Sequence, residues 1–506
     1  MFNTAVRMFE QTAQKFSDKT AVVDANGSVT FAQLAQQAKA IGSALLAARG
    51  AVRELTPLIV YLPKSIAAVS CYLGAQYSGN PYVPVADDIP MVRLESIAAN
   101  LGEGFLITSR DMVSRLENVN LSAVKVLLLE DALETEINHS AIEQAVSTVI
   151  DSDPIYIMFT SGSTGVPKGV TIPHRGILDY ADWLKDTFQF DEHTVLGNQS
   201  AFYFDNSTLD LYTMCRTGAT VYLIPAVLFR FPAKLMEYVR DNRINTIFWV
   251  PTVMISVANQ NALADLELPD LKKILFCGEV MPNRQLNVWR KALPDAMYAN
   301  LYGPTEITDV CTYYIVDREF SDGDTLPIGK ACRNMRALVL RPDNTLCDVG
   351  ETGDLCIQGS ALARGYWNAQ EITRKAFVQN PMQRYYDDRM YRTGDLAYWA
   401  ADGNLMFVGR ADSQIKHRGN RIELGEIETA AKCIPAIGNA AALFDAAKED
   451  IVLFAETDEK LILRKLNMEL RKILPSYMLP TRLVCMHALP QTPNGKIDRV
   501  TLKSTF

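Results

Sequence analysis

A strand followed by a glycine-rich loop carries the residues best suited to hold phosphate groups. The stretch reads YIMFTSGSTGVPKGV over 156–170, where an apolar, β-prone run leads into Gly, Ser and Thr and then a lysine. Glycines let backbone N–H groups approach phosphate oxygens, hydroxyls add donors, and the lysine adds a positive charge. The predicted phosphate-contacting residues are Thr160, Ser161, Gly162, Ser163, Thr164, Gly165 and Lys168.

This loop does not fit the Walker A pattern of P-loop NTPases. That pattern needs four residues between two glycines and a Ser or Thr directly after the lysine. Here STGVP separates Gly162 from Lys168, and Gly169 follows the lysine. The loop therefore predicts phosphate binding outside the P-loop NTPases, and a flexible surface turn is the alternative.

Composition and charge narrow the class of protein. A chain of 506 residues exceeds what one hydrophobic core usually organises, so we expect two or more domains. Lys and Arg number 50 against 58 Asp and Glu, and no basic run is present, which argues against a nucleic-acid partner. The N-terminal residues lack a continuous apolar segment, so we expect no secretory signal, no membrane span and a cytoplasmic location.

The metal-binding residues are dispersed. Nine cysteines form no C-x-x-C pair and the five histidines are scattered, which argues against a protein-bound transition metal. A magnesium ion that arrives with a nucleotide needs only one or two carboxylates. Glu279 and Glu306 each follow a glycine turn at a predicted strand end, so we expect them to face one ligand in a common crevice.

The elements that must position these residues alternate between strands and helices. This alternation is typical of α/β proteins with doubly wound parallel sheets, whose ligands bind at the carboxyl ends of the strands. The predicted strands lie at 58–65, 82–85, 105–109, 124–130, 219–225, 246–251, 272–279 and 297–308.

Two changes in the pattern of predicted strands and helices indicate the domain boundaries. Short β runs with turn signals predict a β-barrel-like subdomain at about 327–411, within a large N-terminal domain of residues 1–411. A hairpin-like segment, a helix and two further strands predict a small α+β domain at 412–506. Its amphipathic segment 459–474 is expected to bury a helical face that begins at Ile462.

Five motifs in order resemble those of the adenylate-forming superfamily. Besides the loop they are YGPTE at 302–306, YRTGD at 391–395, GRADSQIKHRGNRIELGEIE at 409–428 and PNGKIDR at 493–499. More narrowly, the chain resembles amino-acid adenylation enzymes, that is, nonribosomal peptide synthetase adenylation domains and stand-alone D-alanine–carrier protein ligases. The resemblance covers nearly the whole chain. It implies that ATP with Mg²⁺ activates a carboxylic acid as an acyl adenylate, which a phosphopantetheine thiol captures.

The resemblance also implies roles for the nucleotide-binding residues. The loop would hold the β- and γ-phosphates, with Lys168 compensating charge, while Thr305 contacts the α-phosphate and Glu306 helps bind magnesium. Lys496 would be the catalytic lysine that bridges the attacking carboxylate and the α-phosphate, although from the residues alone it is a solvated lysine. The remaining nucleotide contacts would be Gly278, Glu279, Asn300 at the adenine amino group, Tyr302 stacked on the ring, Asp395 on both ribose hydroxyls, and Arg410 near the ribose.

Two residues of the C-terminal part receive roles in the same way. Asp412 corresponds to the hinge about which the small domain rotates, with a simple linker residue as the alternative. Gly419 corresponds to the glycine that lets pantetheine pass in the thioester-forming state, as part of a thiolation tunnel. Because the chain stops soon after Lys496, we expect the carrier protein to be a separate partner.

Asp205 is the most informative residue for the substrate. It matches the aspartate that pairs with the α-ammonium group in relatives that activate amino acids, whereas fatty-acid and aryl-acid relatives lack this carboxylate. Four apolar positions would make the pocket narrow and so favour a small amino acid. The residues carried over to the pocket are Asp205, Asn206, Leu209, Phe248, Leu275, Cys277, Leu301, Asp309 and Val310.

The polar pocket residues leave the substrate open. Cys277 resembles the cysteine of D-alanine ligases, but Asn206 and Asp309 replace apolar residues there. Since an unpaired buried carboxylate is costly, one hypothesis is that Asp309 meets a hydroxyl or amino group of the substrate side chain. The alternative is that Asp309 bonds Asn206 or the backbone. A CoA ligase of the same superfamily and a non-catalytic nucleotide- or carrier-binding scaffold are the alternative functions.

Overall fold

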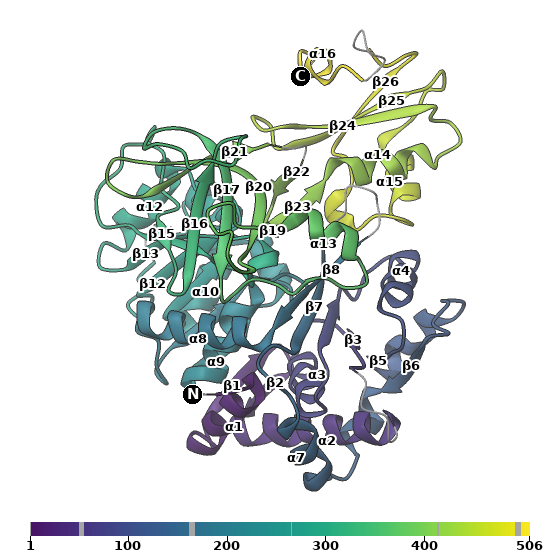
Figure 1. Cartoon of the computed structure of the whole chain (residues 1–506), viewed down its shortest axis with the longest axis vertical. Helices are drawn as coiled ribbons and strands as arrows, with labels where there is room; N and C mark the ends of the chain where they lie inside the picture. The colour runs from purple at the N-terminus through teal and green to yellow at the C-terminus, as the bar shows by residue number, and fades with distance from the viewer. Residues whose placement is uncertain are drawn as a thin grey trace.

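The computed structural model describes residues 2–49, 55–160, 167–264, 266–411, 414–490 and 497–505. Two large mixed sheets flanked by helices make up most of the molecule, and the C-terminal elements lie together at one end (Figure 1). The predicted α/β class with doubly wound sheets is confirmed. None of the helices in these ranges is long and apolar enough to cross a membrane.

The larger sheet has nine strands in the order β15-β14-β13-β12-β11-β9-β10-β1-β2. Its central strands run parallel, whereas β2, β14 and β15 pair antiparallel at the two edges. The strands are β1 (Thr20–Asp24), β2 (Gly27–Thr30), β9 (Val195–Asn198), β10 (Thr220–Leu223), β11 (Thr246–Trp249), β12 (Lys273–Cys277), β13 (Met297–Tyr302), β14 (Thr312–Ile315) and β15 (Lys330–Ala331).

The second sheet has seven strands in the order β18-β8-β7-β4-β3-β5-β6. Its central strands run parallel, and β8 turns back antiparallel to β7 across the predicted phosphate loop. The strands are β3 (Leu58–Tyr61), β4 (Tyr82–Val85), β5 (Gly104–Thr108), β6 (Val124–Leu128), β7 (Pro154–Thr160), β8 (Lys168–Pro173) and β18 (Gly365–Tyr366).

One hydrophobic core joins the two sheets. Side chains of both sheets and of α2, α3, α8 and α9 belong to it, while the opposite face of each sheet has a core of its own. Helices α2 and α3 cross so closely that a Cβ on Gly74 would lie 2.7 Å from Ile41. The helices of this part are α1 (Ala5–Lys15), α2 (Phe31–Arg49), α3 (Ile66–Tyr77), α4 (Met91–Leu101), α5 (Arg110–Val113), α6 (Leu129–Leu133), α7 (His139–Ser147), α8 (His174–Phe188), α9 (Ser207–Thr217), α10 (Pro232–Asp241), α11 (Pro251–Asn259), α12 (Asn283–Ala292) and α13 (Gln370–Ala376).

An antiparallel sheet occupies the region predicted to be barrel-like. Strands β16, β17, β20 and β19 pair in that order, and β21 pairs with the long β20. Its strands are β16 (Met335–Leu340), β17 (Gly353–Gly359), β19 (Phe377–Gln379), β20 (Arg389–Trp399) and β21 (Leu405–Arg410).

The C-terminal elements have hydrophobic cores separate from those of the large sheets. Ile462, predicted to face the core, is 54% exposed because α15 starts only after it; Leu466 and Leu470 are buried as expected. The proposed boundary at 411/412 stays a prediction. The elements are β22 (Gln414–His417), β23 (Asn420–Glu423), α14 (Leu424–Lys432), β24 (Asn439–Asp445), β25 (Asp450–Glu456), α15 (Leu463–Leu470), β26 (Arg482–Met486) and α16 (Arg499–Lys503).

Candidate active site

A cavity of about 550 Å³ lies where the nine-stranded sheet, the antiparallel sheet that contains β20 and β21, and the β22–β23 hairpin meet. Its walls come from the ends of β12 and β13, from β20 and β21, and from the hairpin. The structure therefore brings together predicted residues that are more than a hundred positions apart in the sequence. Those in its wall are Gly278, Glu279, Asn300, Leu301, Tyr302, Asp395 and Arg410.

Asp395 is the buried acidic centre of this cavity. It stands directly opposite Arg410 in the antiparallel β20–β21 pair, and the Arg410 guanidinium donates to its Oδ1 at 2.9 Å. The Tyr302 hydroxyl donates to its Oδ2. Asn300, on β13 beside Tyr302, donates its amide N–H to the Pro327 carbonyl at 2.8 Å. Protein donors thus fix the orientation of both the carboxylate and the amide.

Glu306 follows the end of β13 and is fully buried. The Arg421 guanidinium, from the hairpin, donates to its Oε2 at 2.6 Å, and the Tyr366 hydroxyl donates to its Oε1 at 2.8 Å. Burial alone would raise the pKa of Glu306, but Arg421 and the Tyr366 hydrogen bond outweigh burial and lower the pKa to about 2. The side chain is therefore an anion held by a neighbouring cation.

Glu279 has different partners from Glu306, although we expected both to face one ligand. Its Oε2 accepts the backbone N–H and the hydroxyl of Thr252, at the start of α11, and its Oε1 accepts the Gly419 N–H at 2.7 Å. Glu279 lines the cavity, whereas Glu306 is not among the lining residues. The two glutamates anchor two different points of the same hairpin.

Gly419 sits where only a residue without a side chain fits. Its φ of +75° lies in the left-handed region, and a Cβ would stand 2.7 Å from Cγ1 of Val250. Earlier in the same hairpin, Lys416 places its ammonium group 5.3 Å from the centre of the Tyr302 ring. Lys416 and Arg421 were not among the predicted site residues, although both lie within the recognised 409–428 motif.

The described ends of the predicted phosphate loop face each other. Thr160 at the end of β7 pairs with Lys168 at the start of β8. The Lys168 ammonium lies 5.4 Å from the centre of the Tyr366 ring, and its charge helps lower the pKa of Glu306. The predicted residues between them, Ser161, Gly162, Ser163, Thr164 and Gly165, lie outside the described residues.

The apolar substrate residues share one face of the large sheet. Phe248 and Leu275 are register partners on β11 and β12, as are Cys277 and Leu301 on β12 and β13. They point into the core between the two sheets, and the alternate residues point into the core on the opposite face. The apolar members of the predicted pocket are all buried: Leu209, Phe248, Leu275, Cys277, Leu301 and Val310.

Asp205 and Asn206 lie just before α9 and are partly buried. Burial raises the pKa of Asp205, against hydrogen bonds from Thr305 and from the Asn206 N–H that lower it. Because burial disfavours the ionised form of Asp205, a nearby positive charge would stabilise that form.

Asp309 is held by a residue that sequence reasoning missed. The Tyr180 hydroxyl, on α8, donates to Asp309 Oδ2 at 2.6 Å, so the expected alternative of an Asn206 or backbone bond at this oxygen is wrong. No motif includes Tyr180, and 129 positions separate the two residues.

Lys496 and Asp412, the predicted catalytic lysine and hinge, lie outside the described residues. Ile497 packs with Leu489 and Leu502 on a core of the C-terminal sheet, whereas the β22–β23 hairpin lines the cavity. Together with Phe444, Ala446 and Glu449, the hairpin thus faces the candidate site in this structure.

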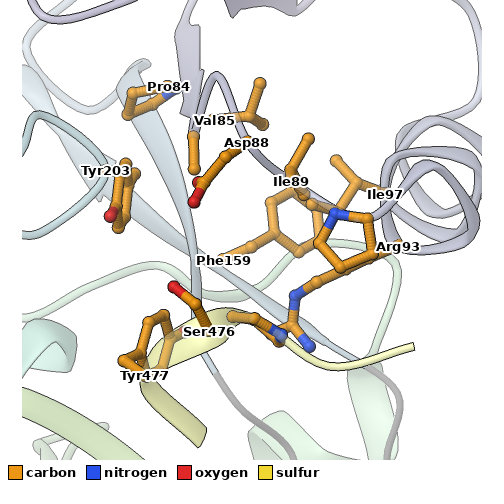
Figure 2. Close-up of a pocket in the computed structure, with 13 residues that line it drawn as sticks. Pro84, Val85, Asp88, Ile89, Arg93, Ile97, Phe159, Tyr203, Ser476 and Tyr477 are labelled. Atoms are coloured by element: carbon orange, nitrogen blue, oxygen red, sulfur yellow. The ribbon is translucent and has the colours of Figure 1, made fainter. Parts of the chain in front are cut away.

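A second, smaller cavity of about 50 Å³ lies between the β4–α4 connection and the turn at 475–477. Figure 2 shows Tyr203 and Tyr477 on one side of it and Arg93 on the other. Arg93 forms a buried ion pair with Glu426 of α14. This pair, like Arg421 with Glu306, ties the C-terminal elements to the large sheets.

Comparisons with known proteins agree with this arrangement. Residues 9–367 match the AMP-binding enzyme family. The chain is 32% identical to an L-proline–[L-prolyl-carrier protein] ligase of Pseudomonas fluorescens over 98% of both chains, and 30% identical to zwittermicin A synthase ZmaJ of Bacillus cereus over 98% of this chain and 94% of that one. It also matches much longer synthases, such as tyrocidine synthase 1 of Brevibacillus parabrevis at 30% identity over 98% of this chain, and spans only 44% of that relative.

Solved structures show the same fold. The crystal structure of IdnL1 superposes with a TM-score of 0.81 at 27% identity, covering 97% of this chain and 99% of that one. Holo-PA1221, described as a protein with adenylation and PCP domains, superposes with a TM-score of 0.83 at 24% identity, covering 99% of this chain and 84% of that one. The chain therefore belongs to the AMP-binding enzyme family, among the amino-acid adenylation enzymes of the adenylate-forming superfamily.

Proposed function

We propose that the protein activates a small α-amino acid with ATP as an aminoacyl adenylate and transfers it to the phosphopantetheine thiol of a separate carrier protein. The observation that carries this proposal is that Asp205 joins burial and Asp309 in raising the pKa of Cys277, while Leu301, in the same core as Cys277, also lines the nucleotide-sized cavity. A partly buried carboxylate there suits a substrate that brings its own ammonium group. The similarity to a proline–carrier protein ligase supports the same reaction class.

The large cavity is the proposed ATP site. Asn300 would bind the adenine amino group and Tyr302 would stack on the ring, both at the end of β13. Asp395 would accept the ribose hydroxyls, and its fixed orientation between Tyr302 and Arg410 supports this bidentate role. Lys168 and Thr160 would contact the phosphates from the ends of β7 and β8.

Glu306 fits a magnesium ion that the phosphates of ATP also hold. The described residues contain no cluster of three or more His, Cys, Asp and Glu side chains for a metal, so such an ion would need phosphate oxygens as further ligands. When bound, it would neutralise phosphate charge. Because Arg421 and Tyr366 already donate to both Glu306 oxygens, we propose that the ion and Arg421 use Glu306 in different states.

In the first reaction a carboxylate oxygen of the amino acid forms a bond to the α-phosphorus, and the bond to the bridging oxygen of pyrophosphate breaks. Thr305 and Lys496 would stabilise the charge on the transferring phosphoryl group, which is the main requirement of such a step. Glu279 and Gly278 would close the cavity on the nucleotide side. Pyrophosphate leaves with the displaced electron pair.

In the second reaction the carrier thiolate attacks the acyl carbon, and AMP leaves with its phosphate oxygen. The docked hairpin supports assigning this structure to that stage, because Gly419 and Arg421 lie against the site while Ile497 packs elsewhere. Rotation of the small domain about Asp412 would move the hairpin away from the site and bring Lys496 to it. Gly419 would leave room for the pantetheine arm.

Intact mass spectrometry of a phosphopantetheinylated carrier protein tests the proposal. With ATP, Mg²⁺ and a pool of amino acids that includes D-alanine, the carrier mass should rise by one aminoacyl group. The Lys496→Ala variant should abolish this gain while retaining the fold. Formation of acyl-CoA from simple acids, with an unmodified carrier, would favour the CoA ligase alternative. A folded protein that releases no pyrophosphate with any substrate would favour the scaffold.

A further inference from the structure

Three carboxylates lie close together at the proposed amino-acid pocket, and two of them have a cation nearby. Burial raises the pKa of both Asp210 and Asp205, and this rise is opposed by Lys64 at Asp210 and by Lys416 at Asp205. For Asp309 the influences are burial, which raises the pKa most, and the neighbouring carboxylates Asp205 and Asp210, which raise it further. A hydrogen bond lowers it, but no cation is among its principal influences. Asp309 is therefore the carboxylate whose charge is least compensated.

The two oxygens of Asp309 have unequal surroundings. Oδ2 accepts the Tyr180 hydroxyl at 2.6 Å, whereas Oδ1 is buried and has no hydrogen-bond partner among the described residues. A buried acceptor without a donor costs about 1–3 kcal/mol. Asp309 also influences the pKa of Cys277, which belongs to the predicted pocket. Asp309 therefore lies close to a residue of the pocket proposed to receive the substrate side chain.

The backbone before Asp309 is held in an unusual conformation. Thr308, a β-branched residue, has a φ of +80°, in the region that such residues rarely adopt. Its carbonyl accepts the Tyr156 hydroxyl at 3.0 Å, and its own hydroxyl donates to the Ala361 carbonyl at 2.7 Å. Strain of this kind persists where surrounding contacts enforce it and is concentrated at functional sites. Asp309 is therefore fixed both through its main chain and through Tyr180.

We propose that Asp309, positioned by Tyr180, binds a second amino group at the end of a short substrate side chain. The inference rests on the proposed function and deepens it: the substrate class is an α-amino acid with a terminal amine, such as a diaminopropionate or diaminobutyrate. Asp205 would pair with the α-ammonium and Asp309 with the side-chain ammonium. The two carboxylates would then be matched by two positive charges.

A hydroxyl or aliphatic side chain fits this site less well than an amine. A hydroxyl would donate to Oδ1 but would supply no positive charge against the burial that raises the Asp309 pKa, and a methyl group would also leave Oδ1 without a donor. Burial and the neighbouring Asp205 raise the pKa of Asp309 well above its usual range, and the Tyr180 hydrogen bond only partly opposes this; an ammonium group would lower the pKa and stabilise the ionised form. Phe248, Leu275 and Leu301 are buried, and these large side chains would leave room for only a short substrate side chain.

A matched series of amino acids tests the proposal by ATP–pyrophosphate exchange. 2,4-Diaminobutyrate, homoserine and norvaline differ only in the group at the end of the same side chain, and 2,3-diaminopropionate, serine and 2-aminobutyrate form a shorter set. The wild-type protein should show a kcat/KM for one of the two diamino acids about 100-fold or more above its aliphatic partner, because its site is built to pair a polar group. A preference for the hydroxyl or aliphatic member of both sets would overturn the proposal.

Two variants separate charge recognition from a structural role. Asp309→Asn should lower the diamino-to-aliphatic ratio of kcat/KM by about 100-fold or more. Tyr180→Phe should move the acidic limb of the pH profile for the diamino acid to higher pH, because Asp309 loses the donor that favours its ionised form. Tyr314→Phe is the matched control, since Tyr314 donates to Asp317 at 2.7 Å away from the pocket residues. An unchanged ratio in Asp309→Asn, or equal profiles for the two tyrosine variants, would contradict the proposal.

The outcomes also distinguish this inference from the proposed function. Exchange supported by alanine, proline or norvaline but by neither diamino acid leaves amino-acid activation in place and overturns only the role of Asp309. Exchange with carboxylic acids that lack an α-amino group, and with no α-amino acid, overturns the proposed function and the inference with it. The same assay and the same protein preparation yield both answers.

Discussion

The ion pair between Arg421 and Glu306 offers the most quantitative prediction about the docked hairpin. The Arg421→Gln variant removes the cation but leaves Glu306 fully buried with its Tyr366 hydrogen bond. The fall of the Glu306 pKa from its usual 4.5 to about 2 corresponds to about 3 kcal/mol in favour of the ionised form. Breaking a buried pair from one side costs about 3–5 kcal/mol, which agrees in size. The free energy of local opening of the hairpin should therefore fall by about 3 kcal/mol.

Hydrogen exchange of a peptide covering residues 414–432, followed by mass spectrometry, measures this opening. At pH 7 the variant should exchange about 100-fold faster than the wild type, because each 1.4 kcal/mol is about a factor of ten. Arg392→Gln is the control: its pair with Asp354 is partly exposed, and such pairs contribute about 1 kcal/mol or less. Exchange in Arg421→Gln no faster than in the control would refute the argument.

The difference in hydrogen exchange between Arg421→Gln and the wild type should depend on pH in a defined direction. In the wild type the Glu306 pKa lies below its unfolded value, so its stabilisation is fully present above pH 4.5 and is lost as pH falls toward 2. Without Arg421, burial raises the pKa of Glu306, so that its carboxyl group becomes neutral at a higher pH. After correction for intrinsic exchange rates, the difference between variant and wild type should shrink as the pH is lowered from 7 to 4. A constant difference would contradict the assigned cause.

Three further predictions concern other parts of the structure. Gly419→Ala should impair thioester formation far more than pyrophosphate exchange, since a Cβ would stand 2.7 Å from Val250; equal losses in the two half-reactions would count against the tunnel role. Asp395→Asn should raise the KM for ATP at least about tenfold with little change in the KM for the amino acid, because a charge-assisted acceptor for the ribose is lost. Buried His174 accepts the Ala5 N–H, and burial lowers its pKa to about 3, so the protein should lose up to about 5 kcal/mol of stability as pH falls from 6.5 toward 3. His174→Gln should flatten that part of a pH–stability curve from chemical denaturation, and an unchanged slope would be inconsistent with this origin.

Much of the fold was predictable because it depends on local patterns. Alternation of strands and helices indicated the doubly wound sheets. Phe248 and Leu275 were assigned to one pocket through the family resemblance, and the structure makes them register partners on adjacent strands. The nucleotide residues Asn300, Tyr302, Asp395 and Arg410 were recognised from motifs, and the structure gathers them in one cavity. Their contact with ATP stays a prediction.

The contacts that the sequence did not indicate depend on how distant segments dock. Tyr180 lies on a helix with no motif, and only the docking of α8 near the β13–β14 connection brings its hydroxyl to Asp309. Arg421 stands within a recognised motif, but its pairing with Glu306 requires the hairpin to lie against the large sheet. Ile462 was placed on the wrong side because its segment becomes helical at Leu463, four residues later than the predicted start at 459.

The central claim is that the protein forms adenylates of α-amino acids. Its most direct test is ATP–pyrophosphate exchange with pairs of acids that differ only in the α-amino group, such as alanine against propionate and 2,4-diaminobutyrate against 4-aminobutyrate. We predict that exchange requires the α-amino member of at least one pair and is lost in Asp205→Ala. Equal exchange with the member that lacks the α-amino group, or full activity in Asp205→Ala, would contradict the account.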